Sequence, residues 1–169
     1  WQGPIRVAEQ IAYLDLLCGG RCLFGFGRGA ASAEYAGFRV PMEEARPRFA
    51  ESAQLITKAL RDEVFEWDGE FYKIPKMSIR PRPMSNPEQR FYASSVSPQS
   101  AEIMAKLGFG MMVIMQNEWT KAAKDIESFR TIARSVGHEP KPPLILTNVS
   151  VAESRSEAFE RGEQYLGAK

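Results

Sequence analysis

Short apolar runs alternate with longer amphipathic stretches along this chain. An apolar run of about four to eight residues bounded by turn residues is typical of a buried strand, and apolar residues at intervals of three and four are typical of a helix. Repeated strand–helix units predict a parallel sheet, because each crossover helix returns the chain to the same end of the sheet. The strands are expected at Arg21–Phe26, Arg90–Ser95, Gly110–Met115 and Leu144–Val151.

The helices are expected between these strands and at both ends of the sequence. Proline is favoured in the first turn of a helix, and Pro4 is followed at helical spacing by Val7, Ile11, Leu14 and Leu17, which predict one apolar face. The other helices are marked by Phe49 to Leu60, by Pro98 to Gly108, by Trp119 to Val136 and by Ser154 to Tyr165.

Two segments depart from the strand–helix alternation. Residues 30–46 predict a loop with at most one helical turn. Val64–Tyr72 alternates around an Asp-Gly pair, which predicts a hairpin, and the proline-rich stretch Arg80–Pro87 predicts a surface connection. We therefore expect a single domain over residues 1–169, with a hairpin and loop insertion near 63–89.

Composition narrows the function classes. The chain has 169 residues, of which 44% are hydrophobic and 25% charged. Its net charge of +1 provides no positive electrostatic field that would attract nucleic acid. No segment is long and apolar enough to span a membrane. Cys18 and Cys22 lie in or beside apolar segments, which favours buried thiols in a reducing, cytoplasmic compartment over a disulfide. With His138 remote in a turn, we expect no metal site.

One glycine-rich stretch is the first candidate for ligand binding. Gly25–Ala30 matches the G-x-G-x-x-G/A dinucleotide fingerprint, but Pro41 interrupts the segment that should continue as a long helix, so a Rossmann site is not expected. Arg28 presents a planar cation at the exit of a predicted strand, a group suited to phosphate. This stretch alone leaves open whether Arg28 binds an anion or points into solvent.

A serine cluster at the end of the next predicted strand is the second candidate. Hydroxyls and free backbone N–H groups meet there at a helix N-terminus, which favours an anion. The alternative is that Ser97 only caps the helix and Ser95 is a solvated loop residue. Arg28 is expected on the neighbouring strand. The predicted cofactor-binding residues are Gly27, Arg28, Gly29, Ser94, Ser95 and Ser97.

Six blocks of sequence occur in the order found in a known family. They are Arg6–Gln10, Leu14–Arg21, Phe24–Gly29, Glu44–Phe49, Trp67–Tyr72 and Ala93–Ser100. In these blocks the chain resembles the bacterial luciferase-like, flavin-dependent monooxygenases (LLM class flavin-dependent oxidoreductases). The resemblance implies a TIM-type (β/α)8 barrel, of which this chain covers about strands four to seven. We accordingly expect an interior fragment that lacks strands one to three and eight.

The resemblance also implies a chemistry. Reduced FMN, supplied by a separate NAD(P)H:flavin reductase, would react with O2 and oxygenate a small, apolar organic substrate, while Arg28 and the turn at Ser95 and Ser97 hold the flavin phosphate. The alternatives are an F420 (deazaflavin)-dependent hydride transfer and a non-catalytic flavin-binding protein. No catalytic residue is assigned, and Glu34 and Tyr35 are expected to be solvated or packed.

Two further expectations come from the resemblance. It implies a homodimer, for which the first helix, with Val7, Ile11 and Leu14, is the candidate interface. The family often carries a polar or thiol residue where this chain has Gly27. That difference removes the basis for assigning a residue that tunes the reactive edge of the flavin.

Overall fold

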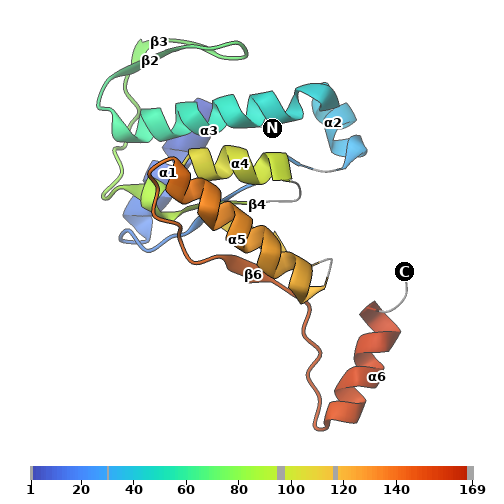
Figure 1. Ribbon diagram of the computed structural model, residues 1–169. Helices are drawn as coiled ribbons and strands as arrows, with labels where there is room; N and C mark the ends of the chain where they lie inside the picture. Colours follow the sequence, from blue (N-terminus) through green and yellow to red (C-terminus); the bar gives the residue numbers. More distant parts are fainter. Residues whose placement is uncertain (1, 30, 95–97, 116–117, 167–169) are drawn as a thin grey trace.

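Four parallel strands form the centre of the molecule. The computed structural model describes residues 2–29, 31–94, 98–115 and 118–166, and the strand order in its main sheet is β1-β4-β5-β6. The parallel α/β arrangement predicted from the sequence is confirmed, and the described strands form an open sheet rather than a closed barrel (Figure 1). The strands are β1 (Phe24–Phe26), β4 (Phe91–Ser94), β5 (Gly110–Ile114) and β6 (Leu144–Leu146).

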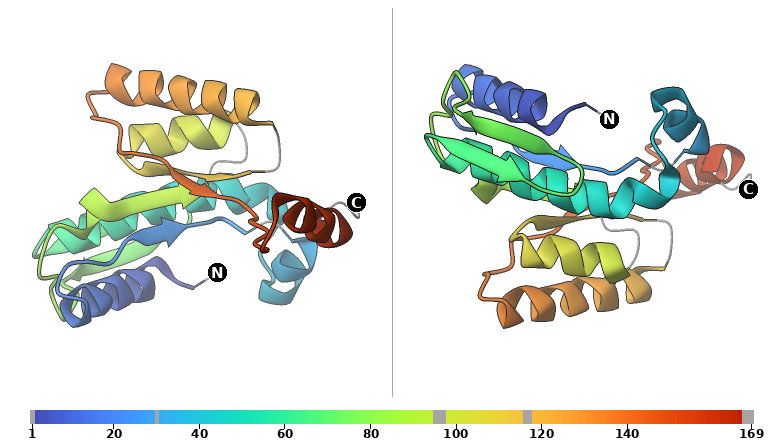
Figure 2. Two further views of the ribbon diagram at one scale, coloured as in Figure 1. Left: turned by 90° about the horizontal axis from the view of Figure 1, so that it is seen from below. Right: turned by 90° about the horizontal axis from the view of Figure 1, so that it is seen from above.

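The helices fall into groups around this sheet. Helices α4 and α5 lie together, α1 and α3 lie together, and α6 stands apart from the rest (Figures 1 and 2). Within the described residues, no helix is long and apolar enough to cross a membrane. The helices are α1 (Pro4–Leu17), α2 (Ser32–Phe38), α3 (Ala45–Arg61), α4 (Pro98–Lys106), α5 (Trp119–Ser135) and α6 (Arg155–Leu166), with 3-10 turns η1 (Met42–Glu44) and η2 (Pro87–Arg90).

The buried face of α1 agrees only in part with the predicted one. Ile11 is buried and Val7 packs against the core as predicted, but Leu14 and Leu17 are 43% and 66% exposed. Ala8, Ala12 and Asp15 are fully buried instead. The small alanine side chains allow α1 to pack closely against α3, and the buried carboxylate is stabilised by partners that lie far away in the sequence.

Three segments also differ in length from the prediction. Strand β1 begins at Phe24 rather than Arg21, because the Cys22 carbonyl accepts a hydrogen bond from the Arg90 side chain. Strand β6 ends at Leu146 rather than Val151, after its last register pair with β5. Helix α2 has seven residues instead of at most one turn, and its buried Tyr35 anchors it.

Phenylalanine rings join β1 to β4. Phe91 on β4 is fully buried, and its ring centroid lies 6.0 Å from that of Phe24, 4.8 Å from that of Phe26 and 5.3 Å from that of Phe109. The pairs with Phe24 and Phe109 are edge-to-face, an arrangement that aromatic rings favour. This packing fixes β1 in register with β4, where Phe24 pairs with Phe91 and Phe26 with Ala93.

The predicted hairpin forms with a longer turn. Strand β2 (Phe65–Asp68) pairs antiparallel with β3 (Lys73–Met77), and Asp68 is opposite Lys73, so four residues connect the strands rather than an Asp-Gly pair. The reason is Glu51 on α3. Its carboxylate accepts hydrogen bonds from the backbone N–H groups of Phe71 and Tyr72, both at 2.9 Å, and from the Trp67 indole at 3.0 Å.

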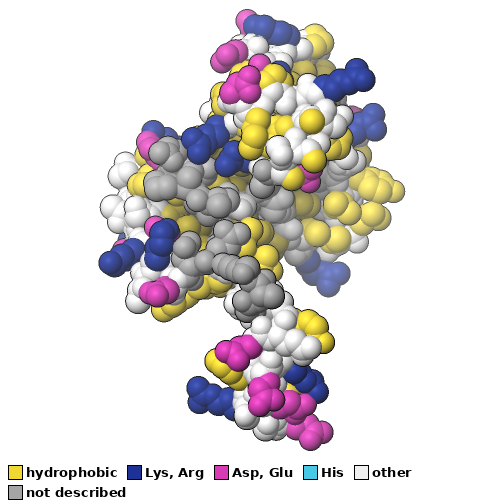
Figure 3. All heavy atoms as spheres, turned by 90° about the vertical axis from the view of Figure 1, so that its right-hand side faces the viewer, with side chains coloured by type: hydrophobic (Ala, Val, Ile, Leu, Met, Phe, Trp, Pro, Cys, Tyr) yellow, Lys and Arg dark blue, Asp and Glu magenta, His cyan; other side chains and the backbone are white. Residues whose placement is uncertain are grey.

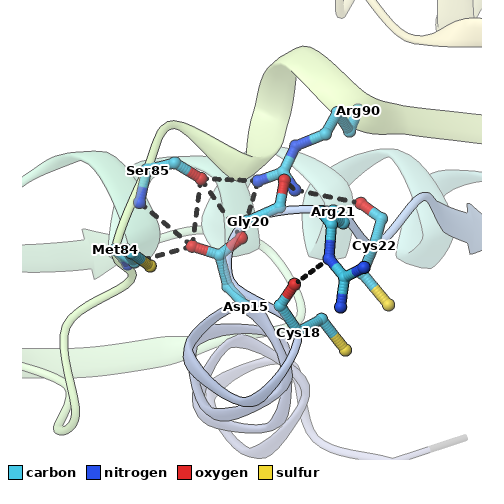
Figure 4. A network of polar contacts seen from close by, with 8 residues as sticks. All are labelled: Asp15, Cys18, Gly20, Arg21, Cys22, Met84, Ser85 and Arg90. Atoms are coloured by element: carbon cyan, nitrogen blue, oxygen red, sulfur yellow. Dashed lines mark hydrogen bonds and ion pairs between the residues drawn. The ribbon is translucent and has the colours of Figure 1, made fainter.

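A buried ion pair joins segments that are distant in the sequence at the other end of the sheet. Asp15 is fully buried, and Arg90, which precedes β4, donates from Nη2 to its carboxylate at 2.6 Å (Figure 4). The backbone N–H groups of Met84 and Ser85 donate to the same carboxylate at 2.9 and 3.0 Å. Arg90 also donates to the carbonyl oxygens of Gly20 and Cys22. The end of α1, the proline-rich connection and the entries to β1 and β4 therefore meet at one site.

The hydrogen bonds outweigh the cost of burying the charge. Burial by itself disfavours the charged form of Asp15, whereas the hydrogen bonds from Arg90 and Ser85 favour it, and the pKa of Asp15 is lowered below its ordinary value as a result. The carboxylate therefore remains charged inside the fold at neutral pH.

We predict that Arg90→Ala lowers the free energy of unfolding of the full-length protein by about 3–5 kcal/mol, because it leaves a buried carboxylate without its cation. Lys121→Ala is the control. It breaks an exposed ion pair with Asp125, 2.8 Å long, and should cost at most about 1 kcal/mol. Urea unfolding of both variants measures the difference, and equal losses would contradict the assignment.

The lowered pKa of Asp15 also predicts that the free energy of unfolding decreases at acidic pH. A folded-state pKa below the unfolded value means that this contribution is complete above about pH 4 and is lost as pH falls through the folded-state pKa. Asp15→Asn removes the titrating group, so its unfolding free energy should depend less on pH below about pH 4 than that of the wild type. Unfolding curves at several acidic pH values test this, and parallel pH profiles would refute it.

Candidate functional site

A cleft of about 520 Å³ lies beside the exit of β1. The start of α1, the end of β1 and the first turns of α3 form its sides, and Tyr72 from the hairpin turn also borders it. Figure 3 looks onto the side of the molecule toward which the strands run, where hydrophobic side chains are spread among charged ones. In parallel α/β folds ligands bind at the carboxyl ends of the strands. The cleft therefore lies where a functional site is expected.

Arg28 is the charged group placed at this cleft by β1. It follows the strand by two residues, is partly buried and lines the cleft together with Gly27. Within the residues that the structure describes, no carboxylate forms an ion pair with it and no hydrogen bond engages its guanidinium group. A partly buried guanidinium that no described carboxylate engages is available to an anionic ligand.

Tyr35 fixes the backbone that carries Arg28. Its side chain is 3% exposed, and its hydroxyl donates to the carbonyl oxygens of Arg28, at 2.9 Å, and Gly29, at 3.2 Å. Gly29 has φ +82°, a conformation that glycine adopts without strain. Helix α2 thus closes the loop after β1 through one side chain. Tyr35 is packed, as expected from the sequence, while Glu34 on the same helix is exposed.

The opposite wall comes from α3 and the hairpin turn. Arg48 pairs with Glu44 at 2.6 Å, and its guanidinium carbon lies 4.6 Å from the centroid of the Phe71 ring. Ser52 donates to the Tyr72 hydroxyl at 3.2 Å. This wall therefore has its own polar partners, in contrast to Arg28. The larger apolar lining residues include Val7, Phe26, Val40, Phe49 and Ile56.

The structure places the six sequence-predicted site residues in different ways. Gly27 and Arg28 line the cleft, and Gly29 follows them without lining it. Ser94 ends β4 and lies one residue beyond the Phe26–Ala93 register pair, so it stands beside Gly27 at the exits of neighbouring strands. Ser95 and Ser97 lie outside the described residues.

The sequence did not predict the residues of the wall that α3 and the hairpin turn form. Arg48, Ser52 and Tyr72 border the cleft, and none of them was singled out for chemistry. A signal existed in part, since Glu44 and Arg48 have the i, i+4 spacing of a helical ion pair. The hairpin turn that brings Tyr72 to α3 has no such local signal, because Glu51 holds it from about 20 residues away.

Comparison with known proteins assigns the family. The sequence profile described as "Luciferase-like monooxygenase" matches residues 1–168. The chain belongs to the luciferase-like monooxygenase family. This confirms the resemblance carried by the six sequence blocks.

Two curated relatives are informative. The alkanal monooxygenase beta chain of Vibrio harveyi is 29% identical over 169 residues, which cover 96% of this chain and 52% of the relative. The flavin-dependent trigonelline monooxygenase, oxygenase component, of Acinetobacter baylyi is 30% identical over 112 residues, 65% of this chain and 31% of that protein. The chain thus spans about half the length of the first relative and a third of the second.

Solved structures agree on the fold. The monooxygenase RslO1 from Streptomyces bottropensis superposes with a TM-score of 0.87 at 29% identity, over 96% of this chain and 51% of that one. An F420-dependent secondary alcohol dehydrogenase superposes with a TM-score of 0.78 at 20% identity, over 97% of this chain and 51% of that one. The second likeness concerns the fold alone.

We predict that Tyr35→Phe lowers the free energy of unfolding of the full-length protein by about 1 kcal/mol, the net value of a typical hydrogen bond. The ring stays packed while the Arg28 and Gly29 carbonyls lose their donor. Tyr165→Phe on α6, where the side chain is exposed, is the matched control and should leave stability unchanged. Thermal unfolding measures both, and an unaffected Tyr35→Phe variant would exclude the anchoring role.

Proposed function

We propose that the full-length protein is a flavin-dependent monooxygenase that uses reduced FMN and O2 to oxygenate a small, apolar organic substrate. The observation that carries the proposal is the Arg28 guanidinium, which lines the cleft at the exit of β1 without an anionic partner in the described residues. Membership of the luciferase-like monooxygenase family supports the reaction class. The oxygenation itself is the chemistry that reduced flavin supplies when bound.

The residues around the cleft fit a cofactor with a planar ring and a phosphate. Val7, Phe26 and Phe49 offer apolar walls, and a Cβ added at Gly27 would meet no atom within 4 Å, so the space beside it is open. In this proposal Arg28 donates to the phosphate. The proposed cofactor-binding residues are Gly27, Arg28, Gly29, Ser94, Ser95 and Ser97.

The protein's own contribution is to orient the reactants and exclude water. The apolar walls exclude water, and Arg28, in the loop that Tyr35 anchors, orients the cofactor. A dry and rigid site favours oxygen transfer over wasteful side reactions. No residue is assigned as acid or base.

Partner proposals follow from the same reaction. Reduced FMN requires a source, and we propose an NAD(P)H:flavin reductase, in line with a relative named as an oxygenase component. We also propose a homodimer. Ile11, part of the face suggested for that interface, is 5% exposed and therefore serves the core. Leu14 is exposed and remains an interface candidate, and the exposed Tyr13 and Leu17 of α1 are added to it.

Arg28→Ala is predicted to weaken FMN binding to the full-length protein by about 1.5–3 kcal/mol, or roughly ten- to a hundredfold in Kd, the range for a hydrogen bond to a charged group. Arg46→Ala is the control, since Arg46 is exposed on α3 and does not line the cleft. Arg28→Lys should recover part of the affinity, because it restores the charge without the planar fork. Fluorescence titration measures Kd, and equal affinity in the wild type and Arg28→Ala would remove Arg28 from the site.

The same titration with F420 separates the two cofactor classes. Tighter binding of F420 than of reduced FMN would replace oxygenation with hydride transfer as the proposed reaction. Binding of FMN without oxygenated product, when an active reductase and a panel of apolar substrates are supplied, would favour the non-catalytic alternative.

A further inference from the structure

Two thiols lie side by side at the end of α1 opposite the cleft. Cys18 directly follows the helix, Cys22 precedes β1, and both are partly exposed and free. Gly19 and Gly20 adopt φ values of +58° and +72° between them, which reverses the chain in a way that glycine allows at little cost. Figure 4 shows both sulfur atoms on the same side of this turn, and the Cys18 side chain is near enough to raise the pKa of the Cys22 thiol.

The backbone is held at both cysteines. Arg21 donates from Nε to the Cys18 carbonyl oxygen at 2.8 Å, and Arg90 donates from Nη1 to the Cys22 carbonyl oxygen at 3.2 Å. The two sulfur atoms are therefore kept near each other by partners on each side of the turn. Close, accessible thiols of this kind are the arrangement in which oxidation of one sulfur is followed by attack of the other.

We propose that Cys18 and Cys22 form a redox-active dithiol that a peroxide oxidises to an intramolecular disulfide. The Cys18 thiolate attacks one peroxide oxygen, the O–O bond breaks, and the departing hydroxide takes up a proton to become water. The Cys22 sulfur then attacks the resulting sulfenic acid, forming the S–S bond and releasing the second water. Two thiols lose two electrons in total, and one hydrogen peroxide becomes two waters.

The order of the two steps follows from the proximity of the two side chains. The Cys18 side chain raises the pKa of the Cys22 thiol, with burial adding to the effect. Cys22 thus keeps its proton more firmly than an ordinary thiol. The thiolate is the attacking species in such chemistry, so Cys18 is assigned the first step and Cys22 the second.

This site is linked to the buried ion pair and not to the cleft. Arg90 contacts the Cys22 carbonyl, the Gly20 carbonyl and the Asp15 carboxylate at once. A disulfide that moves the turn between the cysteines would therefore change the surroundings of the Asp15–Arg90 pair. Oxidation is expected to shift the thermal unfolding temperature, and reduction with dithiothreitol should reverse the shift.

The sequence provides a direct assay, because Arg21 lies between the two cysteines. The full-length protein is treated with hydrogen peroxide, alkylated with iodoacetamide and digested with trypsin, which cuts after Arg21. In the reduced protein, Cys18 and Cys22 should leave in separate alkylated peptides. After peroxide they should remain joined, in a species lighter than the sum of the unalkylated peptides by two hydrogen atoms.

Single variants test the assignment of roles. Cys22→Ser should accumulate a sulfenic acid at Cys18 that dimedone traps, and both Cys22→Ser and Cys18→Ser should lose the joined species completely. Separate peptides from the peroxide-treated wild type would overturn the proposal. So would a joined species that appears only in a covalent dimer of two chains, or a wild type in which peroxide leaves both thiols free to react with iodoacetamide.

Discussion

A carboxylate without access to water determines how this chain is assembled. Asp15 is stable inside the fold because Arg90 and two backbone N–H groups satisfy it together, and a buried charge with fewer partners would oppose folding. Satisfying Asp15 brings the end of α1 against the proline-rich connection and against the residue that precedes β4. Arg90 also contacts the carbonyls of Gly20 and Cys22, which lead into β1. The two strands therefore begin next to each other.

This arrangement at the start of the strands sets the geometry at their ends. With β1 and β4 fixed in parallel register from Phe24–Phe91 to Phe26–Ala93, Gly27 and Ser94 must emerge side by side. The arginine side chains at the two ends of β1 then have different surroundings. At its entry the Arg90 guanidinium is engaged by protein oxygens, whereas at its exit Arg28 has no such partner among the described residues. The arginine that holds the fold together and the arginine proposed to bind a ligand thus lie at opposite ends of one short strand.

Local patterns predicted the elements that depend on local forces. Apolar periodicity located all four strands of the sheet and the long helices. Ser154, expected at the start of the last helix, caps α6 by accepting a hydrogen bond from the Glu157 N–H at 3.2 Å. Periodicity placed Ile11 on the buried face of α1 but did not predict the burial of Asp15, because the reason for burying Asp15 is a partner 75 residues away. It also misplaced the hairpin turn, which Glu51 determines from α3. For the site, the sequence identified Gly27 and Arg28 at the cleft, but long-range contacts supply the second wall.

The segment after β1 differs from the corresponding segment of a dinucleotide-binding fold. In a dinucleotide fold, a long helix begins directly after the glycines and its N-terminus attracts the phosphates. Here the chain instead enters α2, a helix of seven residues, and the next strand, β2, belongs to a separate antiparallel hairpin. Tyr35 uses this short helix to hold the carbonyls of Arg28 and Gly29. The helix that follows the glycines is therefore short, and the positive charge that β1 itself brings to its exit is the Arg28 side chain.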